Sequence, residues 1–191
     1  VDNVNDTITE GDSKGTDIAW STASTFTLDD NVENLLLRGS SDIDGVGNNL
    51  ANRIIGNSGA NTLTGNGGND TLYGYGGDDI LEGGDGNDIL DGGSGADDLR
   101  GGDGNDRYIV DNVNDTITEG ESQGTDTAYS RASTFTLSAN VENLRLAGSS
   151  DIDGVGNALA NTIRGNSGAN TLTGHEGNDS LKGYGGDDIL N

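Results

Sequence analysis

A glycine recurs every nine residues along two stretches of this chain. Seven nonapeptides follow without a gap from Gly47, and four more begin at Gly156. Position 4 is also Gly in all but the first unit of each stretch, position 6 is Asp or Asn, and position 8 is Ile, Leu or once Tyr. Glycine permits positive φ and close backbone approach, while the three residues around position 8 can form a very short strand. The pattern therefore predicts stacked coils of short strands and tight turns.

The nonapeptides lie inside a longer tandem repeat. Residues 1–82 align with residues 110–191 at an offset of 109, and 65 of the 82 aligned pairs are identical. We therefore predict two copies, the second of them truncated. The predicted division is a first copy 1–109, with irregular coils 1–46 and a nonapeptide run 47–109, and a second copy 110–191, with irregular coils 110–155 and a run 156–191.

Composition limits what such a chain can bind. Nine Lys and Arg against 33 Asp and Glu give a net charge of −24, which repels nucleic acids and anionic membranes. Hydrophobic residues make up only 30% and cysteine is absent, so a thick core and disulfides are excluded. No apolar stretch approaches the roughly 20 residues of a membrane-spanning helix. High charge with low hydrophobicity is typical of disorder, unless divalent cations neutralise the carboxylates.

The period also predicts which carboxylates meet. Two nonapeptides make one coil, and stacked coils pair as parallel strands roughly 4.8 Å apart. Turns on one side of the stack are then separated by two units in sequence. Asp70, Asp88 and Asp106 are predicted on one side, and Asp79 and Asp97 on the other. A cation that needs six to eight oxygens can obtain them only from two stacked turns, which favours the pairs Asp70/Asp88, Asp88/Asp106 and Asp79/Asp97.

The units that begin at Gly83, Gly92 and Gly101 match the pattern G-G-x-G-x-D-x-U-x at every defined position, if Tyr108 is allowed as the apolar residue. The chain here resembles the RTX (repeats-in-toxin, hemolysin-type) family of calcium-binding nonapeptide repeats. This resemblance implies an all-β fold, a right-handed parallel β-roll or β-solenoid with calcium-binding turns and several bound Ca²⁺ ions. The absence of any persistent 3.6-residue pattern agrees, because it predicts little or no helix.

The resemblance also implies a ligand set. Backbone carbonyls at positions 2 and 4 join the position-6 carboxylate, so the implied metal ligands are Asn66, Gly68, Asp70, Tyr75, Gly77, Asp79, Gly84, Gly86, Asp88, Gly93, Gly95, Asp97, Gly102, Gly104, Asp106, His175, Gly177, Asp179, Tyr184, Gly186 and Asp188. The nine-residue register continues to Asp115, and Asp126 and its counterpart Asp17 are candidates for further sites. Asn52 and Asn61 replace Asp, so their turns are predicted to be weak or metal-free, with stacked asparagines.

Other interpretations of the same residues are less favoured. A flexible glycine linker would not keep one apolar residue every nine, although it describes the expected calcium-free state. Tyr73, Tyr75 and Tyr184 are interpreted as partly exposed surface residues rather than a carbohydrate-stacking stripe. Phe26, Phe135, Trp20 and Tyr129 are predicted to pack in the core or at edges of the irregular coils. The single histidine, His175, has no partner for zinc or triad chemistry, and flat faces offer no cleft for a glycosidase, so no enzyme activity is predicted.

The expected function is calcium binding coupled to folding. Val1 is no natural start and no signal peptide is visible, so we expect a fragment whose targeting signal lies elsewhere. The resemblance implies a secreted, extracellular protein of a Gram-negative bacterium, exported by type I secretion, in which the roll is a folding aid or rigid spacer beside an effector domain outside this fragment. Two alternatives stay open: an adhesive module that binds an extracellular polysaccharide or surface, and the non-catalytic C-terminal part of a secreted enzyme.

Overall fold

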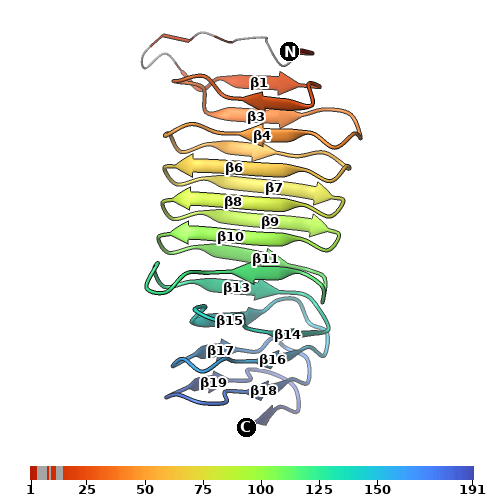
Figure 1. Cartoon of the computed structure of the whole chain (residues 1–191). Coiled ribbons are helices and arrows are strands. Elements are labelled where there is room, and N and C mark those ends of the chain that lie inside the picture. Colours follow the sequence, from red (N-terminus) through yellow and green to blue (C-terminus); the bar gives the residue numbers. More distant parts are fainter. Residues whose placement is uncertain (4–7, 9, 12–14) are drawn as a thin grey trace.

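The computed structural model describes residues 1–3, 8, 10–11 and 15–191, so part of the predicted irregular segment 1–46 lies outside the described residues. Throughout the described residues the chain winds into one roll of parallel strands without a helix (Figure 1). Among them there is accordingly no helix long and apolar enough to cross a membrane. The predicted all-β parallel β-roll is confirmed.

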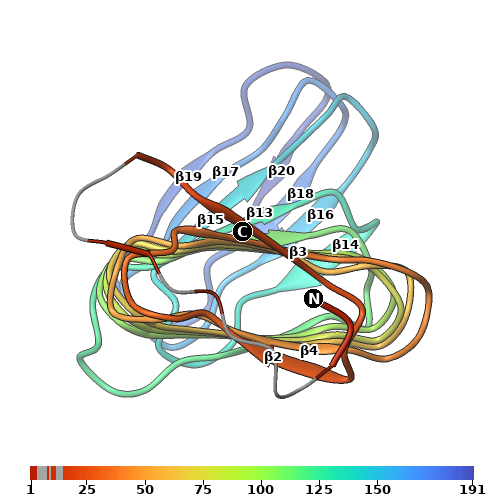
Figure 2. The same cartoon turned by 90° about the horizontal axis from the view of Figure 1, so that it is seen from above.

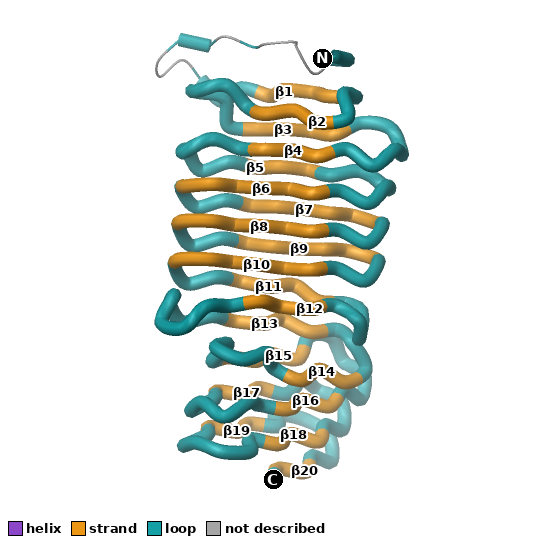
Figure 3. Tube along the Cα trace, viewed as in Figure 1, coloured by secondary structure: helices purple, strands orange, loops and turns teal. Residues whose placement is uncertain are grey.

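Strands alternate between two faces of the roll, because each coil passes through one strand on each face (Figure 3). The odd-numbered strands form a 10-stranded sheet: β1 (Ile18–Ser21), β3 (Asn34–Leu37), β5 (Arg53–Ile55), β7 (Thr71–Gly76), β9 (Ile89–Ser94), β11 (Arg107–Val110), β13 (Thr127–Ser130), β15 (Asn143–Leu146), β17 (Thr162–Arg164) and β19 (Ser180–Lys182). A 6-stranded sheet holds β2 (Thr25–Thr27), β4 (Asp44–Val46), β6 (Thr62–Gly67), β8 (Ile80–Asp85), β10 (Asp98–Asp103) and β12 (Thr116–Thr118). A 4-stranded sheet holds β14 (Thr134–Thr136), β16 (Asp153–Val155), β18 (Thr171–Thr173) and β20 (Ile189–Leu190).

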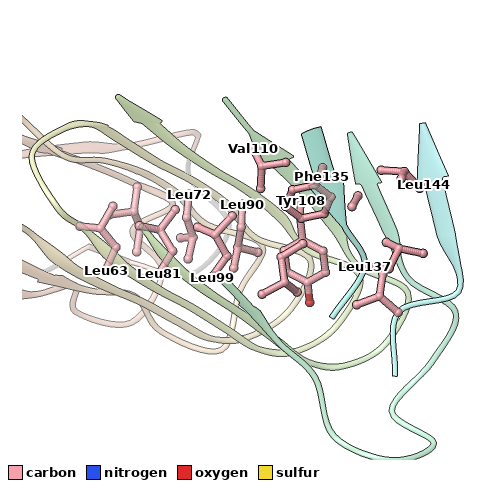
Figure 4. Close-up of a cluster of buried hydrophobic side chains, with 14 of the residues drawn as sticks. Leu63, Leu72, Leu81, Leu90, Leu99, Tyr108, Val110, Phe135, Leu137 and Leu144 are labelled. Carbon is pink, nitrogen blue, oxygen red and sulfur yellow. The ribbon is translucent and has the colours of Figure 1, made fainter. Parts of the chain in front are cut away.

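The core is a column of position-8 side chains. In the nonapeptide run each strand pairs with the strand that lies two units further along the chain, so Leu63 pairs with Leu81 and Leu81 with Leu99. These leucines are fully buried, while the residues on either side of them face outward, as alternation along a strand requires. Figure 4 shows the side chains following one another along the axis of the roll. Burial of each leucine contributes about 2 kcal/mol, which makes a thin but continuous core.

The irregular coils keep the strands but change the turns. Ile18 pairs with Asn34, which is a shorter spacing than in the nonapeptide run, and Arg107 pairs with Thr127, which is a longer one. The length difference is taken up in the turns, because the paired strands stay in register. The regular spacing persists just past the first run, where Leu99 pairs with Ile117. The prediction that the irregular segment extends the same roll is therefore confirmed.

The sheet that faces the 10-stranded one is interrupted between β12 and β14. Seen from above, the coils after this interruption are turned relative to those before it, which lie nearly in line with one another (Figure 2). The 10-stranded sheet runs through the bend without a break, from β11 to β13 and β15. The roll is thus continuous on one face and divided on the other.

The aromatic residues of the irregular coils divide between core and surface. Phe26 and Phe135 are buried, as predicted. Trp20 is not in the core: it is 50% exposed on β1, the edge strand of the 10-stranded sheet, because alternation along β1 buries Ala19 and points residue 20 outward. Its ring lies 3.8 Å beneath the Arg38 guanidinium carbon, a cation–π contact on the outer face. Tyr129 is half-buried on the same outer face of the 10-stranded sheet.

Candidate metal sites in the stacked turns

The nonapeptide turns are of two kinds, distinguished by their backbone. Every turn with Asp at position 6 has positive φ at positions 2 and 4, whereas turns with Asn at position 6 do not. Tyr75 and His175, with φ of 75° and 73°, adopt this left-handed conformation despite bulky side chains, which is uncommon for such residues. The positions concerned are Asn66, Gly68, Tyr75, Gly77, Gly84, Gly86, Gly93, Gly95, Gly102, Gly104, His175, Gly177, Tyr184 and Gly186.

Stacking brings the carbonyl oxygens at positions 2 and 4 against the next turn of the same side. A Cβ atom added to Gly84 would overlap the carbonyl oxygen of Asn66, and one added to Gly86 would overlap that of Gly68. The next turn repeats the arrangement, since a Cβ on Gly104 would overlap the Gly86 carbonyl oxygen. Glycine is required at these positions because only a bare Cα permits such an approach. The stacked carbonyls form a row of hard oxygen donors.

The position-6 carboxylates link successive coils. The backbone N–H of Asp70 donates to Oδ1 of Asp88 at 2.7 Å, and the N–H of Asp88 donates to Oδ1 of Asp106 at 2.8 Å. On the other side the N–H of Asp79 donates to Oδ1 of Asp97 at 2.9 Å. The predicted pairs Asp70/Asp88, Asp88/Asp106 and Asp79/Asp97 thus lie in adjacent turns.

The second oxygen of each of these carboxylates lacks a partner. Oδ2 is buried and makes no hydrogen bond in Asp70, Asp79, Asp88, Asp97 and Asp106. The five side chains are no more than 2% exposed. A buried carboxylate oxygen without a partner is costly, so five in register indicate a missing counter-charge. Carboxylate and carbonyl oxygens together are the donors that Ca²⁺ prefers, and the residues present therefore fit calcium.

Burial shifts the protonation of these groups. It raises the pKa of Asp70, Asp97 and Asp106 from 3.8 to about 7, and that of Asp79 to about 6. Backbone N–H groups of the preceding coil act in the opposite direction, and nearby carboxylates raise the pKa further. The pKa of Asp88 is raised for the same main reason, its burial. Without a cation, these aspartates therefore keep a proton to a higher pH than an exposed aspartate does.

In turns with Asn at position 6, the polar side-chain atoms form hydrogen bonds with the protein itself. The side-chain oxygen of Asn61 accepts the N–H of Asn57 at 2.8 Å, and its Nδ2 donates to the Ile43 carbonyl of the preceding coil at 2.9 Å. Oδ1 of Asn57 accepts the N–H of Gly59 at 2.7 Å. The same arrangement recurs around Asn52, Asn161 and Asn170. Amide groups of two asparagines thus fill these turns with hydrogen bonds, whereas the Asp turns of the first run keep an unpartnered carboxylate oxygen.

The remaining predicted residues have different surroundings. Asp115 is buried, but its Oδ2 accepts the N–H groups of Asp111 and Asn112 at 3.1 and 3.0 Å. Asp126 is buried in the next coil, and its backbone N–H donates to Oε2 of Glu142. The backbone N–H of Asp17 donates to Oε2 of Glu33 in the same way.

The turns of the second run are more open. Asp179 and Asp188 are only half-buried, and the side chains of His175 and Tyr184 are exposed. Oδ1 of Asp179 accepts the N–H of Asn161 at 2.9 Å, so the coil before it contributes an asparagine rather than a second carboxylate. The second run therefore gathers less negative charge in each turn than the first.

The repeat itself is found in other proteins. The profile of the RTX calcium-binding nonapeptide repeat matches four segments, residues 46–81, 73–108, 82–117 and 155–190, which together cover more than half of the chain. The chain belongs to this RTX repeat family. Comparison with curated proteins finds no match. Family and fold agree, since the matched segments include the turns with positive φ and unpartnered carboxylates.

Sequence reasoning about the RTX pattern missed Glu119. It lies two units after Gly101, at a place where the nonapeptides always have glycine. It is 8% exposed, and neither carboxylate oxygen has a hydrogen-bond partner. Burial, followed by the charges of Asp126 and Asp106, raises its pKa to about 8. A carboxylate at a position otherwise reserved for glycine was the available signal.

Proposed function

We propose that this RTX roll binds several calcium ions between stacked turns and folds as it binds them, outside the cell. The five buried, unpartnered Oδ2 atoms in register support this proposal most directly. A bound calcium ion supplies the positive charge that these carboxylates lack. The aspartates hold successive coils in register through their Oδ1 atoms, and the glycine carbonyls present oxygen donors beside them.

Coupling to calcium suits a module that must stay unfolded before export. Calcium is scarce in the cytosol and abundant outside the cell, so the acidic chain would order only after secretion. We infer that the folded roll then acts as a folding aid or rigid spacer for an effector domain outside this fragment. The division into two copies, 1–109 and 110–191, makes the spacer extensible, because each copy adds coils to the same 10-stranded sheet.

Calorimetric titration of the metal-free full chain tests the proposal. Calcium is expected to bind with a stoichiometry of several ions per chain and to release few protons near pH 7, because the aspartates of the unfolded, metal-free chain are already ionised there. Small-angle scattering on the same samples should change from an expanded coil to an elongated rod. A chain that takes up no calcium at millimolar concentration, or stays expanded when loaded, would contradict it.

A second function, binding of an acidic polysaccharide, is favoured by one surface. The outer face of the 10-stranded sheet holds a cavity of about 610 Å³, lined among others by Arg107, Arg131, Arg145, Tyr129 and Tyr184. The guanidinium carbons of Arg107 and Arg145 lie 4.1 and 5.7 Å from the Tyr129 ring centroid. The expectation of flat faces without a hollow is thus wrong at the bend of the roll. Arginines recognise carboxylates through planar hydrogen bonds, and an aromatic ring can stack on a sugar.

The double variant Arg145→Ala/Tyr129→Ala tests this surface. In calcium it is expected to weaken retention of the chain on an immobilised polyuronate by about thirtyfold, since each of the two lost contacts is worth about 1 kcal/mol. Arg100→Ala is the matched control, because Arg100 lies on the 6-stranded sheet and pairs with Glu82 and Asp98. This function would be excluded if the wild type and both variants were retained equally, or if none of the three proteins were retained.

A further inference from the structure

The first nonapeptide run ends at an unusual turn. After β12 the chain enters residues 119–126, which stack on the turn of Asp106 before β13 begins. The N–H of Asp106 donates to Oδ1 of Asp126 at 2.8 Å, across a longer stretch of sequence than the corresponding bonds within the run. The N–H of Gly104 donates to the Gln123 carbonyl at 2.6 Å. The longer turn formed by residues 119–126 thus stacks on the turn of Asp106, the last regular turn of the run.

Three carboxylates meet where these two turns stack. One oxygen each from Asp106, Glu119 and Asp126 lies within 4.8 Å of the other two. In the described part of the chain this is the one group of three or more potential metal-binding side chains. All three are buried, with exposed fractions of 2%, 8% and 1%. Elsewhere in the first run, adjacent turns contribute one position-6 carboxylate each.

The unpartnered oxygens of this group point toward one place. The point at which a Cβ of residue 101 would stand lies within 2.6 Å of Tyr108 Oη, Asp106 Oδ2 and Glu119 Oε1. None of these oxygens has a hydrogen-bond partner, and neither has Glu119 Oε2. Gly101 leaves this place open because it has no side chain. Three buried, unpartnered oxygen atoms from different residues therefore converge beside Gly101.

Tyr108 is part of the same arrangement. It occupies position 8, where every other nonapeptide has Ile or Leu, and it is fully buried. Figure 4 shows its ring in line with the leucine side chains of the core. Its hydroxyl, which those residues lack, reaches the neighbourhood of Asp106 and Glu119. A buried tyrosine hydroxyl without a hydrogen-bond partner destabilises an apolar core. It becomes favourable when it can donate to the neighbouring carboxylates or contact a cation that they bind.

We propose that Asp106, Glu119 and Asp126 form a separate cation site at the junction of the two copies, with the Tyr108 hydroxyl at its border. The proposal rests on the calcium-binding function of the roll and adds a residue outside the nonapeptide pattern. Three carboxylates carry a charge of −3 when ionised, one more than a pair from two stacked turns. Affinity for hard cations rises with ligand charge, so this site should bind calcium more tightly than the regular turns and favour trivalent lanthanides.

Its position assigns it a structural task. β12 is the last strand of the 6-stranded sheet, and the 4-stranded sheet begins with β14. The site joins the last regular turn to the turn that leads from β12 into β13, which continues in the 10-stranded sheet. Charge compensation there would hold the wide turn 119–126 against the run and so fix the bend between the two parts of the roll.

Terbium luminescence of the full chain tests the proposal, because a tyrosine ring sensitises Tb³⁺ only from a short distance. In the wild type, emission excited through tyrosine is expected at the first equivalent of Tb³⁺. Glu119→Gln should lose most of this emission and bind one calcium ion fewer in calorimetry. Glu121→Gln, which removes the same charge from an exposed residue of the same turn, should change neither.

Tyr108→Phe is the second variant, in case Glu119→Gln does not fold. It should keep the number of calcium ions and lose most of the emission sensitised at the first equivalent of Tb³⁺, because the ring without its hydroxyl no longer absorbs and emits as tyrosine. Unchanged emission in Tyr108→Phe, or an unchanged calcium count and emission in folded Glu119→Gln, would overturn the junction site while leaving the regular turns intact. A wild type that binds no calcium would instead overturn the proposed function itself.

Discussion

Removal of calcium with a chelator at about pH 8 is expected to convert the chain from a β-roll to mostly coil. The roll buries five position-6 carboxylates whose Oδ2 atoms lack partners. An unpaired buried charge costs several kcal/mol, whereas a whole domain is stable by only about 5–15 kcal/mol. The thin core and the net charge of −24 offer no compensation. Far-ultraviolet circular dichroism should show coil in chelator and β structure after millimolar calcium is restored.

Magnesium is the control for that experiment. It demands near-octahedral geometry and gives up its waters reluctantly, so it should restore little β structure at the same concentration. Sodium chloride at matched ionic strength tests screening alone, which acts weakly on buried charges. The same β content in chelator and in calcium would refute metal-dependent folding.

Acid should partly replace calcium, because the aspartates of the folded roll have raised pKa values. Protonation stabilises the metal-free roll when the folded pKa exceeds the unfolded one. For Asp70, Asp97 and Asp106 this stabilisation is complete below about pH 4 and is lost as the pH rises through about 7. In chelator, β structure should therefore increase between about pH 8 and pH 5, and calcium affinity should fall over the same range.

The regular part of the roll was predictable because its sequence period is its structural period. Glycine and aspartate at fixed places encode the turn, and one apolar residue per unit encodes the core. Leu63, Leu81 and Leu99 stack as that period requires. The pairing of Asp70 with Asp88, and of Asp79 with Asp97, followed from the same coil of two units.

The irregular coils were less predictable, because a period cannot specify how a longer turn folds. The extra residues between Asp106 and Asp126 leave these two carboxylates in adjacent turns but bring Glu119 beside them. Whether a strand residue faces outward depends on register, which the sequence outside the runs does not mark, so the sequence left open whether Trp20 lies in the core or at an edge. The bend after β12 coincides with a long coil followed by a short one, since Arg107 pairs with Thr127 and Thr127 with Asn143.

Asp88→Ala is expected to raise the calcium concentration at the folding midpoint more than Asp188→Ala does. Asp88 lies in the middle of its row: its Oδ1 accepts the N–H of Asp70, and its own N–H donates to Asp106. Asp188 is in the last coil of the roll, half-buried, and stacks on Asn170. Loss of a central carboxylate disturbs two layers, and stability in a repeat protein propagates through neighbouring interfaces. The cost at position 88 should be about 2 kcal/mol, roughly thirtyfold in the folding equilibrium.

Calcium titrations followed by circular dichroism, in one buffer for all variants, measure both midpoints. Asp85→Ala is the matched control, because it removes one carboxylate from the turn of Asp88 at an exposed position. It should shift the midpoint little, or lower it slightly by relieving repulsion, since Asp85 raises the pKa of Asp88 through its charge. Equal midpoints for Asp88→Ala and Asp188→Ala would mean that each turn binds its ion independently, and a larger shift for Asp188→Ala would refute sharing between stacked turns.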